Sequence, residues 1–216
     1  MKYASIDIET SGLDTENNQV LSIGAVIEDT TKKLPWDEIP KFNAIVLQRQ
    51  ITGSPRALEM NSRIIKWMGE YLDGPEVIRE TLKSKVDFYE KDEVAKAFYE
   101  FLYPYFGAPL DDDVTIGELV DQKSFWGQAK PILINVAGKN FGTFDNVFLK
   151  KLPWWQKLII AKQRILDPAM LFMDWGKDEE LPSLTICKER AGVEGIVTHD
   201  ALEDSMDVVE VLRKFY

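Results

Sequence analysis

Apolar and polar residues alternate near the start of the chain, and this pattern predicts a β-strand over residues 4–10. Alternate side chains of a strand point to the same face. We therefore expect Ile6 and Ile8 to face the core, while Asp7 and Glu9 project together on the other side. Two more apolar runs, at residues 20–28 and 42–47, predict the second and third strands of a meander.

Three other segments are predicted to be helical. Residues 54–71 form one helix with a proline near its first position, and residues 91–105 form an amphipathic one. A third helix follows Asp200, which together with Glu203 resembles a capping box with Asp in place of Ser or Thr. This helix runs to about residue 215, and its inward stripe consists of Ala201, Ser205, Val208, Leu212 and Phe215. Strands and helices together indicate one α/β unit.

Residues 132–149 read as a buried apolar strand, a glycine-containing turn and the start of another helix. Thr143 is the predicted N-cap of that helix. Asp145 then lies in the first turn, where a carboxylate meets the positive end of the helix dipole.

The acidic residues of the first strand suggest a metal site. Asp7 and Glu9 lie about 6.6 Å apart along the strand, and two neighbouring carboxylates repel each other unless a cation sits between them. Oxygen ligands on a rigid strand suit Mg²⁺ or Mn²⁺. Taken alone, the same pattern fits a half-exposed edge strand with a polar outer face.

His199 is the only histidine of the chain. It lies just before the last predicted helix, and Asp204 lies one turn into that helix, so both side chains can reach the same small volume. An isolated histidine at such a position is more often a cap or a packing residue.

Three blocks together resemble the DEDDh exonucleases, a group that includes polymerase proofreading subunits and oligoribonucleases. The blocks are Asp7 with Glu9, the segment from Asn140 to Asp145, and His199 followed by Asp204. Their order, spacing and predicted structural setting match from residue 3 to about residue 215. The resemblance implies a ribonuclease H-like fold: a mixed central sheet, with a three-strand antiparallel meander plus parallel strands, flanked by helices. It also implies one exonuclease domain over residues 1–216, and we expect an irregular insertion near 107–130.

The resemblance further implies a two-metal exonuclease. The residues expected to hold two divalent cations, Mg²⁺ or Mn²⁺, are Asp7, Glu9, Asp145 and Asp204. His199 would accept a proton from the attacking water, and the product would be a nucleoside 5′-monophosphate released from a 3′ end.

Substrate contacts follow by analogy with related exonucleases. The residues expected to meet the terminal nucleotide are Thr10, Gly12, Leu13 and Asn140. Three of them have a local alternative as well: Gly12 suits a turn with positive φ, Leu13 suits the core, and Asn140 suits the turn before Asp145.

Composition narrows the partners. The 216 residues are 45% hydrophobic and 29% charged, as in ordinary globular proteins. The net charge of −10 argues against tight binding to long duplexes through many phosphates, but it is compatible with short or single-stranded 3′ ends. A homodimer and a polymerase or repair partner both stay open.

Cysteine usage and hydropathy bear on the compartment. Cys187 is the sole cysteine, which excludes an intramolecular disulfide and favours a reducing compartment. The N-terminus lacks a signal-peptide pattern, and no apolar run approaches the length of a membrane span. We therefore expect a cytoplasmic protein with no membrane partner.

Alternative functions stay open at this point. One is a non-catalytic nucleic-acid-binding module that retains the fold. Another, within the enzyme class, is a DNA-proofreading or repair exonuclease, and a third is a metal-stabilised structural domain. Residues 151–157 mix lysines with Trp154 and Trp155, a composition that fits either a base-stacking platform or helix packing.

Overall fold

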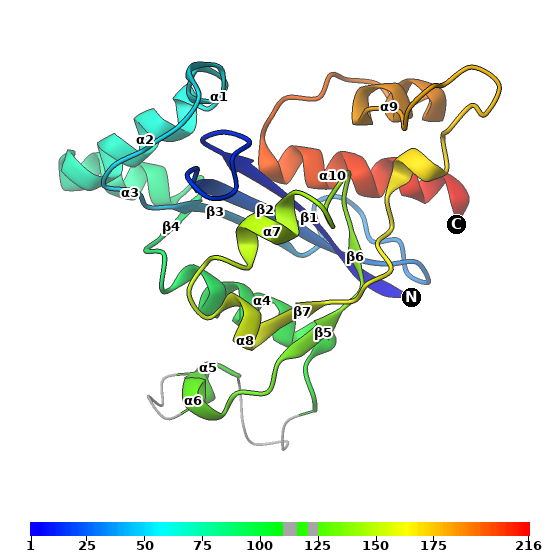
Figure 1. The fold of residues 1–216 in the computed structure, drawn as a ribbon. Coiled ribbons are helices and arrows are strands. Elements are labelled where there is room, and N and C mark those ends of the chain that lie inside the picture. Colours follow the sequence, from blue (N-terminus) through cyan, green and yellow to red (C-terminus); the bar gives the residue numbers. More distant parts are fainter. Residues whose placement is uncertain (110–115, 121–124) are drawn as a thin grey trace.

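A computed structural model describes residues 1–109, 116–120 and 125–216 (Figure 1). Its main sheet has five strands in the order β4-β3-β2-β1-β6. These strands are β1 (Lys2–Thr10), β2 (Val20–Asp29), β3 (Lys41–Val46), β4 (Asp87–Tyr89) and β6 (Val136–Ala137). The first three form the predicted antiparallel meander, while β4 and β6 pair in parallel with β3 and β1. The strand with the two acids is therefore an interior strand of a mixed sheet.

The single strand predicted after residue 132 is wrong in one respect, because the segment divides between two sheets. β5 (Ile132–Ile134) pairs with β7 (Ile159–Ala161), whereas β6 pairs with β1. Asn135 lies between them, and its side-chain amide donates to the Lys2 carbonyl at 2.9 Å. This side chain binds the backbone at the start of β1, and Leu133 in β5 is exposed rather than buried.

One face of the main sheet carries the largest part of the core. Ala4, Ile6 and Ile8 of β1 pack there with residues of α4 (Val94–Phe106), α7 (Asp145–Leu149) and α8 (Trp155–Leu158). Trp155 is buried and stacks on Phe98 with ring centroids 5.0 Å apart, so its role is packing. Trp154 remains partly exposed and lies beneath the ammonium groups of Lys96 and Lys157.

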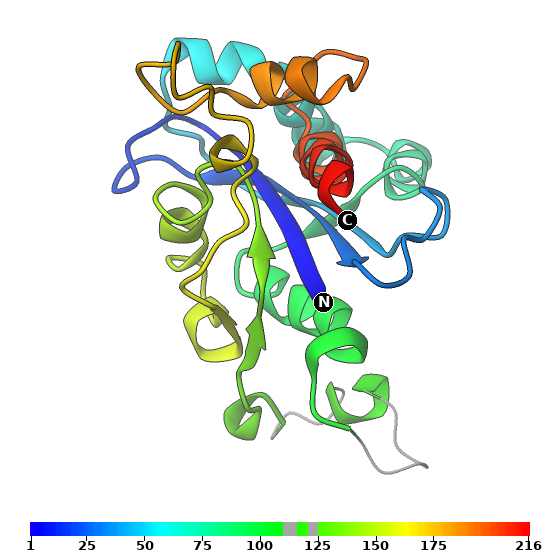
Figure 2. The same ribbon diagram turned by 90° about the vertical axis from the view of Figure 1, so that its right-hand side faces the viewer.

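The opposite face is covered by α10 (Ala201–Leu212), with α9 (Leu184–Ala191) beside it, and by α2 (Ser62–Asp73). Figures 1 and 2 both show α10 and α4 on opposite sides of the sheet. Gly24 in β2 permits a very close approach of α10, because a Cβ atom there would lie 2.1 Å from the backbone of Ala201. The start of α10 is thus held directly against the sheet.

Two helix predictions need correction. Residues 54–71 form two helices, α1 (Pro55–Met60) and α2, which separate at Asn61. The buried Asn61 side chain turns inward and donates to the carbonyls of Thr10 and Ala57, which explains the break.

The final helix ends at Leu212 and continues only as a 3₁₀ turn, η2 (Arg213–Phe215). Phe215 is 53% exposed, so it does not belong to the inward stripe, whereas the other four stripe residues are buried. Asp200 caps α10 through the backbone N–H groups of Leu202 and Glu203. Glu203 does not close the capping box, because its carboxylate accepts instead from the Thr198 hydroxyl at 2.5 Å.

The remaining described elements are α3 (Glu76–Lys83), α5 (Ile116–Val120), α6 (Phe125–Gln128) and η1 (Pro168–Met170). The expected insertion near 107–130 contains α5 and α6, and its acidic run at 111–113 lies outside the described residues. The domain limits stay a prediction. Cys187 is fully buried. In the part of the chain that the structure describes, no helix combines the length and hydrophobicity needed to span a bilayer.

Candidate active site

The carboxyl end of β1 places the first two acids beneath the start of α10. Ile6 and Ile8 are buried on the α4 side, so Asp7 and Glu9 face the other way, as the alternation predicts. Across the antiparallel pair, Asp7 is opposite Gly24 and Glu9 is opposite Ser22. These small partners leave room for α10 to approach the two carboxylates.

Asp145 reaches the same end of β1 from α7. It is only 3% exposed, and its Oδ1 accepts from the backbone N–H of Ile8 at 3.1 Å. The predicted Thr143 cap is wrong: Phe144 occupies the N-cap position, without a capping hydrogen bond from its side chain. The Thr143 hydroxyl donates instead to the Asn140 carbonyl at 3.2 Å and serves the preceding turn.

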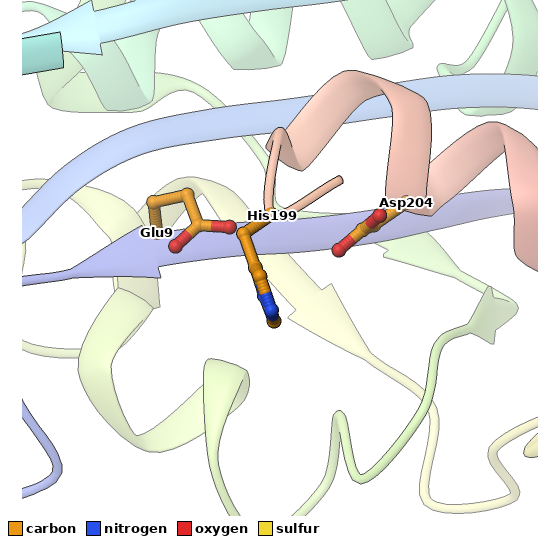
Figure 3. A group of neighbouring side chains, drawn as sticks. All are labelled: Glu9, His199 and Asp204. Atoms are coloured by element: carbon orange, nitrogen blue, oxygen red, sulfur yellow. The ribbon is translucent and has the colours of Figure 1, made fainter. Parts of the chain in front are cut away.

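His199 and Asp204 come from the start of α10. One ligand atom each of Glu9, His199 and Asp204 lies within 4.8 Å of the others. Figure 3 shows the His199 side chain between the two carboxylates, with Glu9 on β1 and the other two at the helix. His199 is exposed and has a left-handed backbone with φ of 54°, which marks the sharp turn into α10.

The charges of these acids interact. Burial raises the pKa of Asp7 well above its ordinary value, and the carboxylates of Asp145, Asp204 and Glu9 raise it further. Burial likewise raises the pKa of Glu9 to about 8, against an opposing hydrogen bond from Asn61.

The other two acids behave alike. Burial raises the pKa of Asp145 to about 7, although the N–H of Ile8 favours its charged form. Burial and the nearby Asp207 charge raise the pKa of Asp204 to about 7. The structure therefore brings all four predicted acids into one electrostatically linked group.

This group fits a divalent cation. None of the ion pairs formed by residues 1–109, 116–120 and 125–216 involves Asp7, Glu9, Asp145 or Asp204. The buried Oδ1 of Asp204 has no hydrogen-bond partner. Hard oxygen donors with unbalanced negative charge are the ligand set that Mg²⁺ or Mn²⁺ prefers, and a neighbouring imidazole nitrogen is compatible with the latter ion.

A pocket of about 410 Å³ opens over Asp7, Glu9, His199 and Asp204. Thr10, Gly12 and Leu13, three of the four residues expected to meet the terminal nucleotide, all line it, and their contact with a substrate stays a prediction. Leu13 is 82% exposed, which excludes the core alternative. The positive-φ explanation of Gly12 is wrong as well, since its φ is not in the left-handed region. A Cβ at Gly12 would instead lie 2.3 Å from the Asn18 amide oxygen.

Asn140 lies outside this pocket, in an adjoining hollow of about 440 Å³ that also contains Asp7 and Asp145. Its φ is 59°, and its backbone N–H donates a hydrogen bond to the Asp167 carboxylate, so Asn140 forms the turn. Its side-chain oxygen accepts from the Lys139 ammonium at 2.7 Å. Asp167 has a structural role, because its carboxylate caps η1 and accepts from the Asn140 N–H of this turn.

The pocket also contains residues that the sequence did not single out, namely Ser54, Arg56, Ala57, Met60, Asn61 and Phe144. Most belong to α1 and the break after it. The Ser-Pro start of α1 was recognisable, but no sequence pattern linked that helix to the acids of β1. The link is tertiary: the Ser54 N–H donates to Ser11 O at 2.9 Å, and Asn61 donates to Thr10 O at 3.2 Å.

Neither a family model nor a curated protein matches the chain. Among solved structures, it is similar to E. coli Exonuclease I, solved in complex with a 5cy-dT13 oligonucleotide. The TM-score is 0.53 at 12% sequence identity, over 98% of this chain and 40% of the length of Exonuclease I. At this identity the likeness concerns the fold: the chain has a ribonuclease H-like architecture of the kind found in that exonuclease.

Proposed function

We propose that this protein is a metal-dependent 3′→5′ exonuclease that releases nucleoside 5′-monophosphates from single-stranded DNA, RNA or short oligonucleotides. The observation that carries the proposal is the meeting of Asp7, Glu9, Asp145 and Asp204, with His199 beside them, where two adjoining hollows share Asp7. These five residues come from three separate elements, and nothing about the stability of the fold requires them to converge.

The four carboxylates would hold two divalent cations. When bound, such ions activate water and neutralise the charge that develops on the leaving oxygen of a phosphodiester. The chain itself supplies rigid placement. Asp7 and Glu9 are fixed on an interior strand, Asp145 is oriented by the Ile8 N–H, and Asp204 sits on a helix pressed against Gly24.

His199 is the proposed general base. Its imidazole lies beside Glu9 and Asp204 but remains exposed, so it can take a proton from water and return it to solvent. The Asp200 cap and the left-handed turn at His199 set the direction of the side chain. His199 would thus accept the proton from water, while the acids would act on the phosphate through the cations that they hold.

Single-stranded substrate suits the pocket and the charge of the chain. Leu13 and Met60 expose apolar side chains at its mouth, 82% and 42% respectively, and unpaired bases can pack on such surfaces. The solved complex of Exonuclease I with an oligonucleotide supports this assignment for a protein of the same fold. A net charge of −10 disfavours long duplexes.

The test is a gel time course on 5′-labelled single-stranded DNA, single-stranded RNA and dinucleotides, with Mg²⁺ or Mn²⁺. We expect a ladder that shortens from the 3′ end and disappears with EDTA. The fastest substrate would separate an oligoribonuclease-like role from DNA trimming. An Asp7→Ala variant is the inactive control. Binding of metal and oligonucleotide without any cleavage would replace the proposal with a non-catalytic binding module.

A further inference from the structure

The acidic pocket contains one guanidinium group, that of Arg56 on α1. The side chain is exposed, and among the described residues it has neither a hydrogen-bond nor an ion-pair partner. An unpaired cation is unexpected here, because the same pocket is lined by the acids Glu9 and Asp204. Arg56 neutralises neither of them, so its charge stays available to a ligand.

Other cations near the site are already engaged. Arg63 on α2 binds Asp200 at 2.5 Å, and its guanidinium lies over the Trp67 ring. Lys139, in the adjoining hollow, donates to the Asn140 side chain at 2.7 Å. Among the described residues, Arg56 is the one Arg or Lys that lines the 410 Å³ pocket, and its guanidinium has no partner there.

The backbone that carries Arg56 is fixed relative to the acids. Residues 52–54 are bonded to Ser11 through the Ser11 hydroxyl, which donates to Thr52 O at 2.6 Å, and through the Ser54 N–H. At Gly53 a Cβ would lie 2.1 Å from Ser11 O, so this segment packs tightly on the end of β1. On the other side of α1, Asn61 holds Thr10.

A strand entering this pocket has more than one phosphate to place. The scissile phosphate belongs at the acidic floor, where bound cations would neutralise it. A second phosphate at the pocket mouth would meet acidic surroundings unless a cation faced it there. An arginine binds phosphate through charge-assisted hydrogen bonds from a planar fork.

We propose that Arg56 is a substrate-positioning residue that binds one backbone phosphate on the 5′ side of the scissile linkage. This inference rests on the proposed nuclease function. It makes oligonucleotides with at least two phosphodiesters better substrates than dinucleotides, which have one. Because the contact is remote from the reacting atoms and equal in ground and transition states, it should act on KM rather than on kcat.

The experiment combines variants with neutral linkages. Single-stranded oligothymidylates contain one uncharged methylphosphonate at the first, second or third linkage upstream of the scissile one. We expect Arg56→Gln to raise KM about tenfold on the all-phosphate substrate, as for loss of one exposed charge-assisted contact, with kcat within about twofold. One neutral linkage should slow the wild type by the same factor and leave Arg56→Gln no slower. Arg56→Lys should restore part of the loss.

Arg164→Gln is the matched control. Arg164 is also an exposed arginine without a partner among the described residues, but it lies in a different hollow with Leu133 and Ile160. The control makes the same change in net charge, and it should leave KM unchanged. Equal effects of Arg56→Gln and Arg164→Gln would overturn the assignment, and so would losses that multiply at every linkage.

Failure of the nuclease proposal remains distinguishable. If the wild type shortens no oligonucleotide, the same substrates with a 5′ fluorophore are titrated by anisotropy. A loss of affinity restricted to one linkage in the wild type, and absent in Arg56→Gln, supports the phosphate contact. The slope of log affinity against log salt concentration should then be smaller in magnitude by about 0.7 for Arg56→Gln than for the wild type, as for loss of one contact to a single strand. Equal affinities of the wild type and Arg56→Gln would overturn it.

Discussion

The acids at the two ends of α10 differ in whether a cation of the chain is paired with them. At the C-terminal end, Glu28 on β2 is 1% exposed and is paired with Arg213, whose Nε lies 2.9 Å from the carboxylate. In the middle of the helix, Asp207 is paired with the buried Lys188 at 2.6 Å. At the N-terminal end, the carboxylates of Asp7, Glu9, Asp145 and Asp204 take part in none of the ion pairs found in the described chain.

This difference separates acids that stabilise the fold from acids that await a ligand. Burial without a neighbouring cation raises the pKa of an acid, and such an acid destabilises the folded protein at neutral pH. The chain supplies cations for the buried Glu28 and the half-buried Asp207, so it has the means to neutralise acids that are shielded from solvent. Leaving the N-terminal group unpaired is consistent with a cation that arrives from solution.

The largest effect is expected at the N-terminal end. Asp7→Asn keeps the shape of the side chain and removes one metal-binding charge. We expect kcat/KM on a labelled single strand to fall at least about 10³-fold. The melting temperature in EDTA should stay the same or rise, because mutual repulsion among the acids is reduced. A variant that loses stability as severely as activity would favour a structural metal site instead.

A slightly smaller loss of turnover is expected at His199. Removing a general base costs about 10²- to 10³-fold in rate, so His199→Ala should lower kcat by that factor. The increase in melting temperature on adding Mg²⁺ should persist, because the four carboxylates remain. If that increase disappears together with turnover, His199 is a metal ligand rather than a base, an arrangement that its distance from Glu9 and Asp204 also permits.

The C-terminal end predicts the opposite result. Glu28→Leu leaves the half-buried Arg213 guanidinium without its carboxylate, and we expect a loss of about 3 kcal/mol in the free energy of unfolding by urea titration. Activity of the folded protein should be unchanged. The double variant Glu28→Leu with Arg213→Met should recover most of the stability, because an apolar pair can replace a buried ion pair. Equal stability of the Glu28→Leu variant and the wild type would remove the contrast between the two ends.

Much of this arrangement was predictable from short-range patterns. The alternation around Asp7 and Glu9 gave the correct faces of β1, because strand geometry has a period of two. Asp200 was recognisable as a cap, and this places His199 before α10 and Asp204 within it. The antiparallel meander of the first three strands followed from local hydrophobic patterns, and the presence of parallel strands followed from resemblance to one family.

The errors arose where a competing contact, either within the same turn or between distant segments, overrides the preference of a single residue. Thr143 has a side chain that can cap a helix, but its hydroxyl donates instead to the carbonyl of Asn140, in the left-handed turn before the helix. The break at Asn61 depends on the Thr10 carbonyl, 51 residues earlier in the chain. Gly12 is small because Asn18 packs against it, not because of its φ. Arg56 was missed for the same reason, since only tertiary packing brings α1 to the acidic site.

The smallest expected effect is a pH dependence that distinguishes the two ends without mutation of either. Burial raises the pKa of Glu9 to about 8 and of Asp204 to about 7, from ordinary values near 4. The folded protein therefore keeps protons that the unfolded chain releases between about pH 4 and pH 8, so the free energy of unfolding falls as pH rises through this window.

Calorimetry in EDTA should show a melting temperature at least about 5 °C lower at pH 8 than at pH 5. Asp178, an ion-paired acid outside α10 with a pKa lowered to about 2 by Arg190, loses its contribution only below about pH 4 and does not enter the window. Saturating Mg²⁺ should abolish the fall, because the deprotonated carboxylates then face a cation, and Asp7→Asn should reduce it. A melting temperature that rises from pH 5 to pH 8 in EDTA would mean that the acids at the N-terminal end of α10 are not held against their own repulsion, and the contrast with the paired end would lose its physical basis.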